Sequence, residues 1–118
     1  MSLLTSAPTW AFIALGSNLG NSRQNVLDAM ERLQGLSGLP IVTSSLWQTT
    51  PVDCPPDSPK FVNAMVGLVV RPAETPESLL KKLRELEVEF GRKPKAVWNE
   101  PRPLDLDLIA FGSETRET

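Results

Sequence analysis

Two aspartates lie inside a stretch whose other residues are typical of a strand. Residues 104–111, L-D-L-D-L-I-A-F, are mostly aliphatic and are bounded by a proline and a glycine, yet they include Asp105 and Asp107. Side chains two residues apart in a strand point to the same face. The alternation therefore predicts that both carboxylates share one face of a sheet and that the leucines share the other.

Four cations precede this strand within eleven positions, namely Arg92, Lys93, Lys95 and Arg102. Mg²⁺ is often bound by one or two carboxylates together with substrate phosphates, and lysine and arginine neutralise the phosphate charge that remains. Two carboxylates about 7 Å apart at their Cβ atoms are able to hold one or two such ions. The residues alone leave a solvated sheet face and a solvated loop open as alternatives.

The composition excludes several kinds of catalytic and metal site. The 118 residues include no histidine, which rules out a histidine base, a Ser-His-Asp triad and a histidine-ligated metal. Cys54 is the only cysteine, so an intrachain disulfide and a multi-cysteine zinc site are excluded as well. The formal charge of −2 argues against a general nucleic-acid binder. The segment G-S-N-L-G-N-S at residues 16–22 matches neither the P-loop nor the dinucleotide-binding fingerprint.

The elements that must position the aspartates follow from hydrophobic periodicity. The pattern predicts strands over residues 10–16, 41–48, 61–70 and 104–111, and helices from Asn21 or Ser22 to about residue 36 and from Pro76 to residue 90. Thr75 is expected to cap the second helix and Gly91 to end it. The order β-α-β-β-α-β predicts an α+β fold of the ferredoxin-like kind, a four-stranded antiparallel sheet with two helices on one face. The helices are expected to cover the leucine face, which leaves the aspartates on the open face.

Length and termini predict one domain over residues 1–118, with residues 1–8 as a loose leader. No apolar run approaches the roughly 20 residues that cross a membrane. The first residues also lack the basic and apolar pattern of a secretory signal. Together with the single cysteine, these features predict a cytoplasmic protein.

Four segments follow one another in the order of a known enzyme family. They are A-L-G-S-N-L-G (residues 14–20), W-Q-T-T-P-V with F-V-N-A (47–52 and 61–64), E-x-x-x-G-R (87–92) and P-R-P-L-D-L-D-L (101–108). The last is the most specific. In these segments the chain resembles the 6-hydroxymethyl-7,8-dihydropterin pyrophosphokinases of folate biosynthesis, over about residues 10–112. The family core is also ferredoxin-like.

The resemblance implies transfer of a diphosphate from ATP to the hydroxymethyl oxygen of the pterin, with AMP as the other product. Two Mg²⁺ ions would bridge the triphosphate, so the reaction depends mainly on positioning and charge neutralisation. In this reading Asp105 and Asp107 resemble the metal ligands, and Arg92 and Arg102 resemble the cations that meet the nucleotide phosphates. These four are the expected catalytic residues.

The nucleotide side of the resemblance adds Glu87 and Lys95. Glu87 resembles a carboxylate that contacts ATP, whereas the residues alone favour a solvated helix charge. The second loop cation of the family falls at Pro94, and Lys93 or Lys95 is expected to replace it. A glutamine common in the family is Arg84 here, which either meets the nucleotide or faces solvent.

The pterin side of the resemblance covers five residues: Thr49, Val52, Phe61, Asn63 and Trp98. Asn63 resembles the amide that reads the hydrogen-bonding edge of the ring, which offers both donors and acceptors. Phe61 resembles an aromatic that stacks on the ring, with core packing as the alternative. The family often has W-G-P-R where this chain has W-N-E-P-R, so either Trp98 or Asn99 takes a second stacking position.

The sequence departs from the family after the last strand. Longer members continue with an extension that carries a histidine, arginines and an aromatic, whereas this sequence ends at Thr118. Two functions are therefore weighed: the diphosphate-transferring enzyme, and a weak or inactive pterin- or nucleotide-binding protein with the same core. The expected partners are ATP and the pterin, with no nucleic acid, membrane or required protein. A nucleic-acid-binding module is disfavoured, because it would present a basic and aromatic sheet face.

Overall fold

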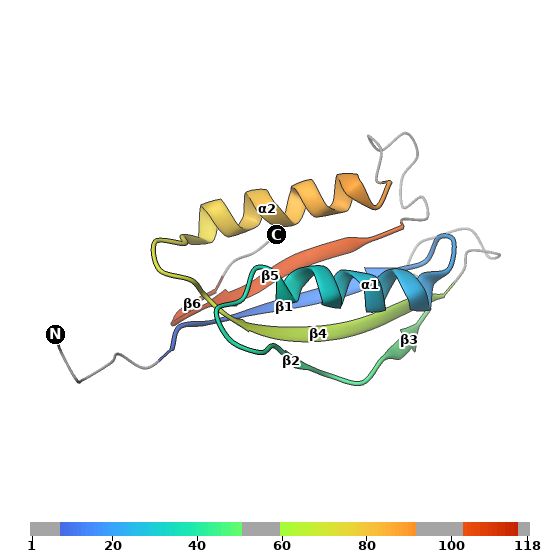
Figure 1. The fold of residues 1–118 in the computed structure, drawn as a ribbon. Coiled ribbons are helices and arrows are strands. Elements are labelled where there is room, and N and C mark those ends of the chain that lie inside the picture. The colour runs from blue at the N-terminus through green and yellow to red at the C-terminus, as the bar shows by residue number, and fades with distance from the viewer. Residues whose placement is uncertain (1–7, 51–59, 92–102, 116–118) are drawn as a thin grey trace, which may run out of the picture.

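The chain folds into helices and strands in an order close to the predicted one. Figure 1 shows the computed structural model, which describes residues 8–50, 60–91 and 103–115. Its elements are β1 (Trp10–Ser17), α1 (Ser22–Gln34), β2 (Val42–Thr43), β3 (Trp47–Thr49), β4 (Phe61–Val69), α2 (Pro76–Glu89), β5 (Asp105–Phe111) and β6 (Glu114–Thr115). Within these described ranges no helix has the length and apolar character that a membrane crossing needs.

The strands form one antiparallel sheet in the order β2-β4-β1-β5-β6, with β3 also paired to β4. The single second strand predicted over residues 41–48 is therefore wrong, because it is split into β2 and β3. At the break Ser44 gives its backbone N–H to Met65 O at 2.9 Å, while its hydroxyl accepts the Met65 N–H at 2.8 Å. A side chain thus replaces a backbone acceptor, and the pairing with β4 shifts by one residue.

Both helices begin where the sequence predicts. Asn21 caps α1 by accepting a hydrogen bond from Gln24 N at 3.2 Å. Thr75 and Ser78 form a reciprocal capping box ahead of α2, and Pro76 occupies the first helical position, where its missing N–H costs nothing. After α2 the chain turns at Gly91, whose φ of +96° favours glycine.

The core lies between the helices and one face of the sheet. The three leucines of the last strand region, Leu104, Leu106 and Leu108, are completely buried. They pack in one cluster with alternate residues of β1 and β4 and with the apolar stripes of α1 and α2. The prediction that these leucines share one sheet face, and that the helices cover this face, is confirmed.

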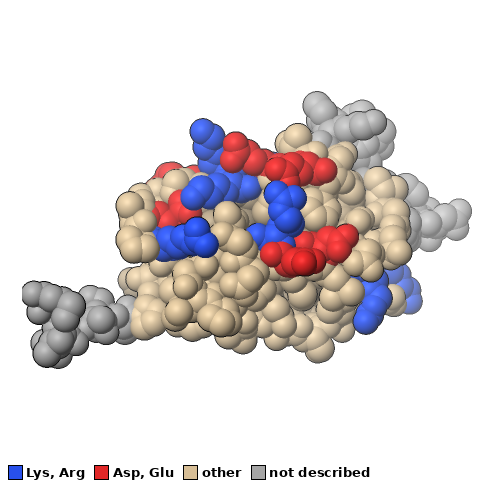
Figure 2. All heavy atoms as spheres, viewed as in Figure 1, with Lys and Arg blue, Asp and Glu red and all other residues tan. Residues whose placement is uncertain are grey.

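Charged side chains lie over the helices on the face that Figure 2 shows. Figure 2 shows acidic and basic groups next to one another there. Three ion pairs are formed within the described residues: Arg32–Glu89 at 2.5 Å between the helices, Lys82–Glu74 at 2.7 Å and Arg84–Glu87 at 2.8 Å.

The α+β class is confirmed by this arrangement of helices on an antiparallel sheet. The finer ferredoxin-like assignment stays a prediction, as does the single-domain assignment. For the site, the important consequence is that the second sheet face carries no helix within the described residues. Asp105 and Asp107 lie on that face.

Candidate functional site

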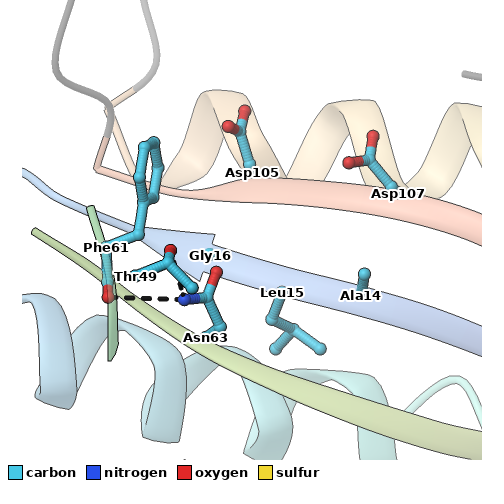
Figure 3. Close-up of a pocket in the computed structure, with 8 residues that line it drawn as sticks. All are labelled: Ala14, Leu15, Gly16, Thr49, Phe61, Asn63, Asp105 and Asp107. Carbon is cyan, nitrogen blue, oxygen red and sulfur yellow. Dashed lines mark hydrogen bonds between the residues drawn. The ribbon is translucent and has the colours of Figure 1, made fainter. Parts of the chain in front are cut away.

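A hollow of about 230 Å³ opens on the helix-free face of the sheet, across β1, β4 and β5. Figure 3 shows both aspartates projecting into it from one side, with Phe61 and Asn63 on the other and Leu15 turned away. Its lining residues are Ala14, Leu15, Gly16, Thr49, Phe61, Asn63, Asp105 and Asp107. Five residues that the sequence analysis singled out, from three segments far apart in the chain, therefore meet at one place.

The two aspartates stand next to the smallest residues of β1. Asp105 lies opposite Gly16 and Asp107 lies opposite Ala14 in the antiparallel register. Both aspartates are half-buried, and Leu106 between them points into the core. Because Gly16 and Ala14 have such small side chains, the described residues of β1 leave room beside the two carboxylates.

The carboxylates fit a hard divalent cation in their chemistry. Mg²⁺ prefers oxygen ligands and commonly takes one or two carboxylates, with phosphate oxygens and water completing the set. Within the described residues this pair is not part of a group of three or more metal-ligating side chains. A pair of carboxylates matches a metal that arrives with a phosphate substrate.

Asn63 is held in one orientation by its amide nitrogen. The nitrogen donates to Thr49 Oγ1 at 2.9 Å and to the carbonyl oxygens of Trp47 and Phe61 at 3.3 Å each. The amide oxygen is therefore turned into the hollow, as Figure 3 shows. Thr49 both lines the hollow and anchors Asn63, a role that its own sequence position gave no reason to expect.

Gly16 lies beneath Phe61 and Asn63. A Cβ atom at this position would meet Asn63 Oδ1 and Phe61 Cδ1 at 3.4 Å each. Phe61 is half-buried and lies outside the buried core cluster. Core packing, the alternative for Phe61, is therefore wrong, and its ring is available at the rim of the hollow.

Glu87 lies away from the hollow and is not a solvated helix charge. Only 3% of it is exposed, and its Oε2 accepts the backbone N–H of Leu106 at 2.8 Å. Its Oε1 pairs with Arg84, whose Nη1 also donates to Leu106 O at 2.8 Å. The solvated-charge alternative is wrong because α2 delivers this carboxylate to the edge of β5, next to the residue between the two aspartates.

Asn25 connects two segments next to the hollow, a role that the sequence analysis missed. Its amide nitrogen donates to Ser17 Oγ at 3.3 Å, to Leu19 O at 3.0 Å and to Pro103 O at 3.2 Å. It thus ties the turn after β1 to the chain just ahead of Asp105. A helix-borne asparagine after a turn carries no local signal for a partner 78 residues away.

Six of the predicted site residues lie outside the described residues: Val52, Arg92, Lys95, Trp98, Asn99 and Arg102. Their assignments stay predictions. The lining of the hollow among the described residues therefore does not include the cationic segment that precedes β5 in the sequence.

Comparisons with known proteins identify relatives of this chain by sequence. The family profile of 7,8-dihydro-6-hydroxymethylpterin-pyrophosphokinase (HPPK) matches residues 12–116. A 2-amino-4-hydroxy-6-hydroxymethyldihydropteridine pyrophosphokinase of Pseudomonas aeruginosa is 39% identical over 106 residues, which cover 87% of this chain and 62% of that relative. The protein of the same name from Haemophilus influenzae is 37% identical over 88% of this chain and 63% of its own length.

A longer relative shows the same match within a larger protein. A folate synthesis bifunctional protein of Arabidopsis thaliana is 39% identical over 92% of this chain, which corresponds to 22% of that protein. The chain thus spans less than two thirds of each of these three relatives. The family match nevertheless begins within β1 and includes α1 to β5 and every described residue that lines the hollow. The chain belongs to the 7,8-dihydro-6-hydroxymethylpterin-pyrophosphokinase family.

Proposed function

We propose that this chain transfers a diphosphate from ATP to the hydroxymethyl oxygen of 6-hydroxymethyl-7,8-dihydropterin and releases AMP, as a step of folate biosynthesis. Membership of the family supports the reaction class. The observation that carries the proposal is the hollow itself, which sets a carboxylate pair across from an oriented amide and an aromatic ring. A phosphate carrier and a flat heterocycle would lie next to each other there.

The β4 side of the hollow is proposed to bind the pterin. Asn63 presents an acceptor oxygen to donors on the ring edge, because its amide nitrogen is already bonded to Thr49 and to backbone carbonyls. Phe61 is proposed to stack on the ring face. The sequence-based assignments of Val52 and Trp98, with Asn99 as the alternative to Trp98, complete the proposed pocket.

The β5 side is proposed to bind the nucleotide through Mg²⁺. Asp105 and Asp107 are the proposed ligands, and two ions are expected with ATP. The bound metal would neutralise triphosphate charge and make the β-phosphorus easier to attack. Arg92, Arg102 and Lys95 are proposed to hold the phosphates, which keeps the pterin oxygen and the phosphorus in line.

The proposed contact between Glu87 and ATP has less support than the others. Both of its carboxylate oxygens already have partners within the chain, on Leu106 and Arg84. ATP and the pterin are the proposed partners. A cytoplasmic setting is proposed as well, supported by the single cysteine.

The test of the proposal is product formation by the chain itself. The protein is mixed with ATP, Mg²⁺ and 6-hydroxymethyl-7,8-dihydropterin, and AMP is followed together with pterin consumption. We expect equal amounts of both, and loss of both in Asp107→Ala. Asp28→Ala is the matched control, because Asp28 is an exposed aspartate of α1 outside the hollow. AMP release that ignores the pterin, or that survives in Asp107→Ala, would contradict the proposal.

A further inference from the structure

The backbone of β5 is bonded on its outer edge by side chains instead of by a strand. At Leu106 the N–H donates to Glu87 Oε2 and the carbonyl oxygen accepts from Arg84 Nη1, each at 2.8 Å. Arg84 and Glu87 are also bonded to each other at 2.8 Å. Among the described residues β6 pairs with β5 only at Ala110 and Phe111, well past this point. We call this pair of side chains the Arg84–Glu87 clamp.

The Glu87 half of the clamp is buried, whereas the Arg84 side chain is 41% exposed. Leu106 is completely buried and only 3% of Glu87 is exposed. A buried carboxylate is costly unless it is paired and hydrogen-bonded, and here it is both. Hydrogen bonds in such surroundings are stronger than in water, so Glu87 holds the Leu106 N–H firmly.

Leu106 is the residue between the two proposed metal ligands. On the inner edge of β5, Asp105 and Asp107 lie opposite Gly16 and Ala14 of β1. The clamp acts from the outer edge, so the three residues 105–107 are held from both sides. Two like-charged carboxylates on one strand face repel each other. A small rotation at Leu106 would change both the spacing and the direction of the pair.

We propose that Arg84 and Glu87 are positioning residues, which set the geometry of the Asp105–Asp107 pair by bonding to the backbone of Leu106. The inference rests on the proposed function, since it concerns the same carboxylates. Arg84 contacts both groups through one nitrogen, because Nη1 pairs with Glu87 Oε1 and also donates to Leu106 O.

The test compares three variants of the full chain. Arg84→Met removes the donors and keeps most of the stem, while Arg84→Gln keeps one donor for Leu106 O. Arg32→Met is the matched control, because Arg32 also pairs with a glutamate of α2, Glu89, and this ion pair between the two helices is half-exposed. Two quantities are measured: hydrogen exchange of the Leu106 amide, and the affinity for Mn²⁺ in the presence of a non-hydrolysable ATP analogue.

We expect Arg84→Met to speed exchange at Leu106 and to weaken Mn²⁺ binding by roughly 10-fold, the lower end of what outer partners of a metal site contribute. Arg84→Gln should restore most of both, and Arg32→Met should change neither. If Arg84→Met matches Arg32→Met in both quantities, the clamp is overturned. Should Arg84→Met not fold, Glu87→Gln replaces it and is judged by exchange of the Leu106 amide, because Glu87 is also a proposed contact of ATP: faster exchange supports the clamp, and a wild-type rate overturns it.

The two proposals fail in different ways. Wild-type protein that binds no Mn²⁺ with the nucleotide analogue contradicts the proposed function. The clamp is then decided by exchange at Leu106 alone, where an unchanged rate in Arg84→Met overturns it and a faster rate supports it. Normal Mn²⁺ binding in wild type with no effect of Arg84→Met contradicts only the clamp.

Discussion

β4 carries the proposed pterin-binding residues Phe61 and Asn63, and β5 carries the proposed metal ligands Asp105 and Asp107. The two strands are held in the sheet in different ways. β4 is paired on both flanks, with β1 along its length and with β2 and β3 on the other side. β5 is paired with β1, but its outer flank near the aspartates is bonded by side chains of α2. Just ahead of β5, Asn25 of α1 bonds to Pro103 O.

Because of this difference, we expect the two sides of the hollow to depend on different parts of the molecule. Asn63 is oriented by neighbours within the sheet, so changes in the helices should leave the proposed pterin side intact. The aspartates are positioned by groups that the helices supply, so the proposed metal side should respond to changes at a distance. Four predictions test this contrast, in order of decreasing expected effect.

Asp105→Asn should remove the metal side and spare the pterin side. The amide keeps the size of the carboxylate but not its charge, and the strand pairing of residue 105 is made by its backbone. We expect Mg²⁺-dependent binding of an ATP analogue to weaken at least about 100-fold, since even outer partners of a metal contribute 10- to 100-fold. Calorimetry measures it, with Asp28→Asn as the control. Unchanged affinity would refute the metal assignment.

Asn63→Ala should weaken binding of the pterin and leave binding of the nucleotide unchanged. It removes the acceptor that faces the hollow, and a ring donor left without a partner costs about 1–3 kcal/mol. Pterin affinity should fall accordingly, while binding of the Mg²⁺–nucleotide stays at the wild-type value. The control is Gln48→Ala, an amide on β3 outside the hollow. Equal losses for both ligands would mean that the two sides are not separate.

Thr49→Val sharpens the contrast, because it leaves Asn63 in place and removes one of its anchors. The hydroxyl that accepts from Asn63 at 2.9 Å is lost, while the β-branched shape is kept. We expect pterin binding to weaken by about 0.5–1.5 kcal/mol, the net value of one hydrogen bond. Fluorescence titration measures this, and Thr43→Val on β2 is the control. A pterin affinity equal to that of the control would show that Thr49 does not orient Asn63.

Glu74→Gln should affect neither side and should show only in stability. Burial acts to raise the pKa of Glu74, but hydrogen bonds from Lys82 and Ser78 and the charge of Lys82 together hold it below the ordinary value of 4.5. The unfolded state thus binds more protons between the two pKa values, so this stabilisation is complete above pH 4.5 and is lost as the pH falls through the folded pKa.

Urea unfolding of Glu74→Gln and wild type at pH 7 and pH 3 measures this effect. We expect a difference of about 0.5–1 kcal/mol at pH 7, as for a partly exposed ion pair, and a smaller one at pH 3. A difference of the same size at both pH values would contradict the assigned pKa direction. Altered pterin or nucleotide binding at pH 7 would contradict the expectation that Glu74 does not influence the hollow.

Much of the fold could be predicted from local pattern. The alternation of leucine and aspartate in residues 104–108 placed each on its correct face, because strand periodicity depends only on neighbours along the chain. Thr75, Pro76 and Gly91 marked the ends of α2 for the same local reason. The family motif was also readable from the sequence.

Features that depend on contacts between distant segments could not be predicted in this way. The break at Ser44 arises from its bonds to Met65 on another strand. Glu87 has the residue type of a solvated helix charge, and only the approach of α2 to β5 made it a buried partner of Leu106. Asn25 found Pro103 only because α1 lies beside the start of β5.

The sequence by itself determined which residues share a face, where the helices begin and to which family the chain is similar. Only the tertiary structure decided that Asp105 and Asp107 stand beside Gly16 and Ala14, and that Asn63 faces them across the hollow. The physical reason is that side-chain alternation is set by backbone geometry within one strand. Register and helix placement are instead set by the packing of the whole core, which no single segment encodes.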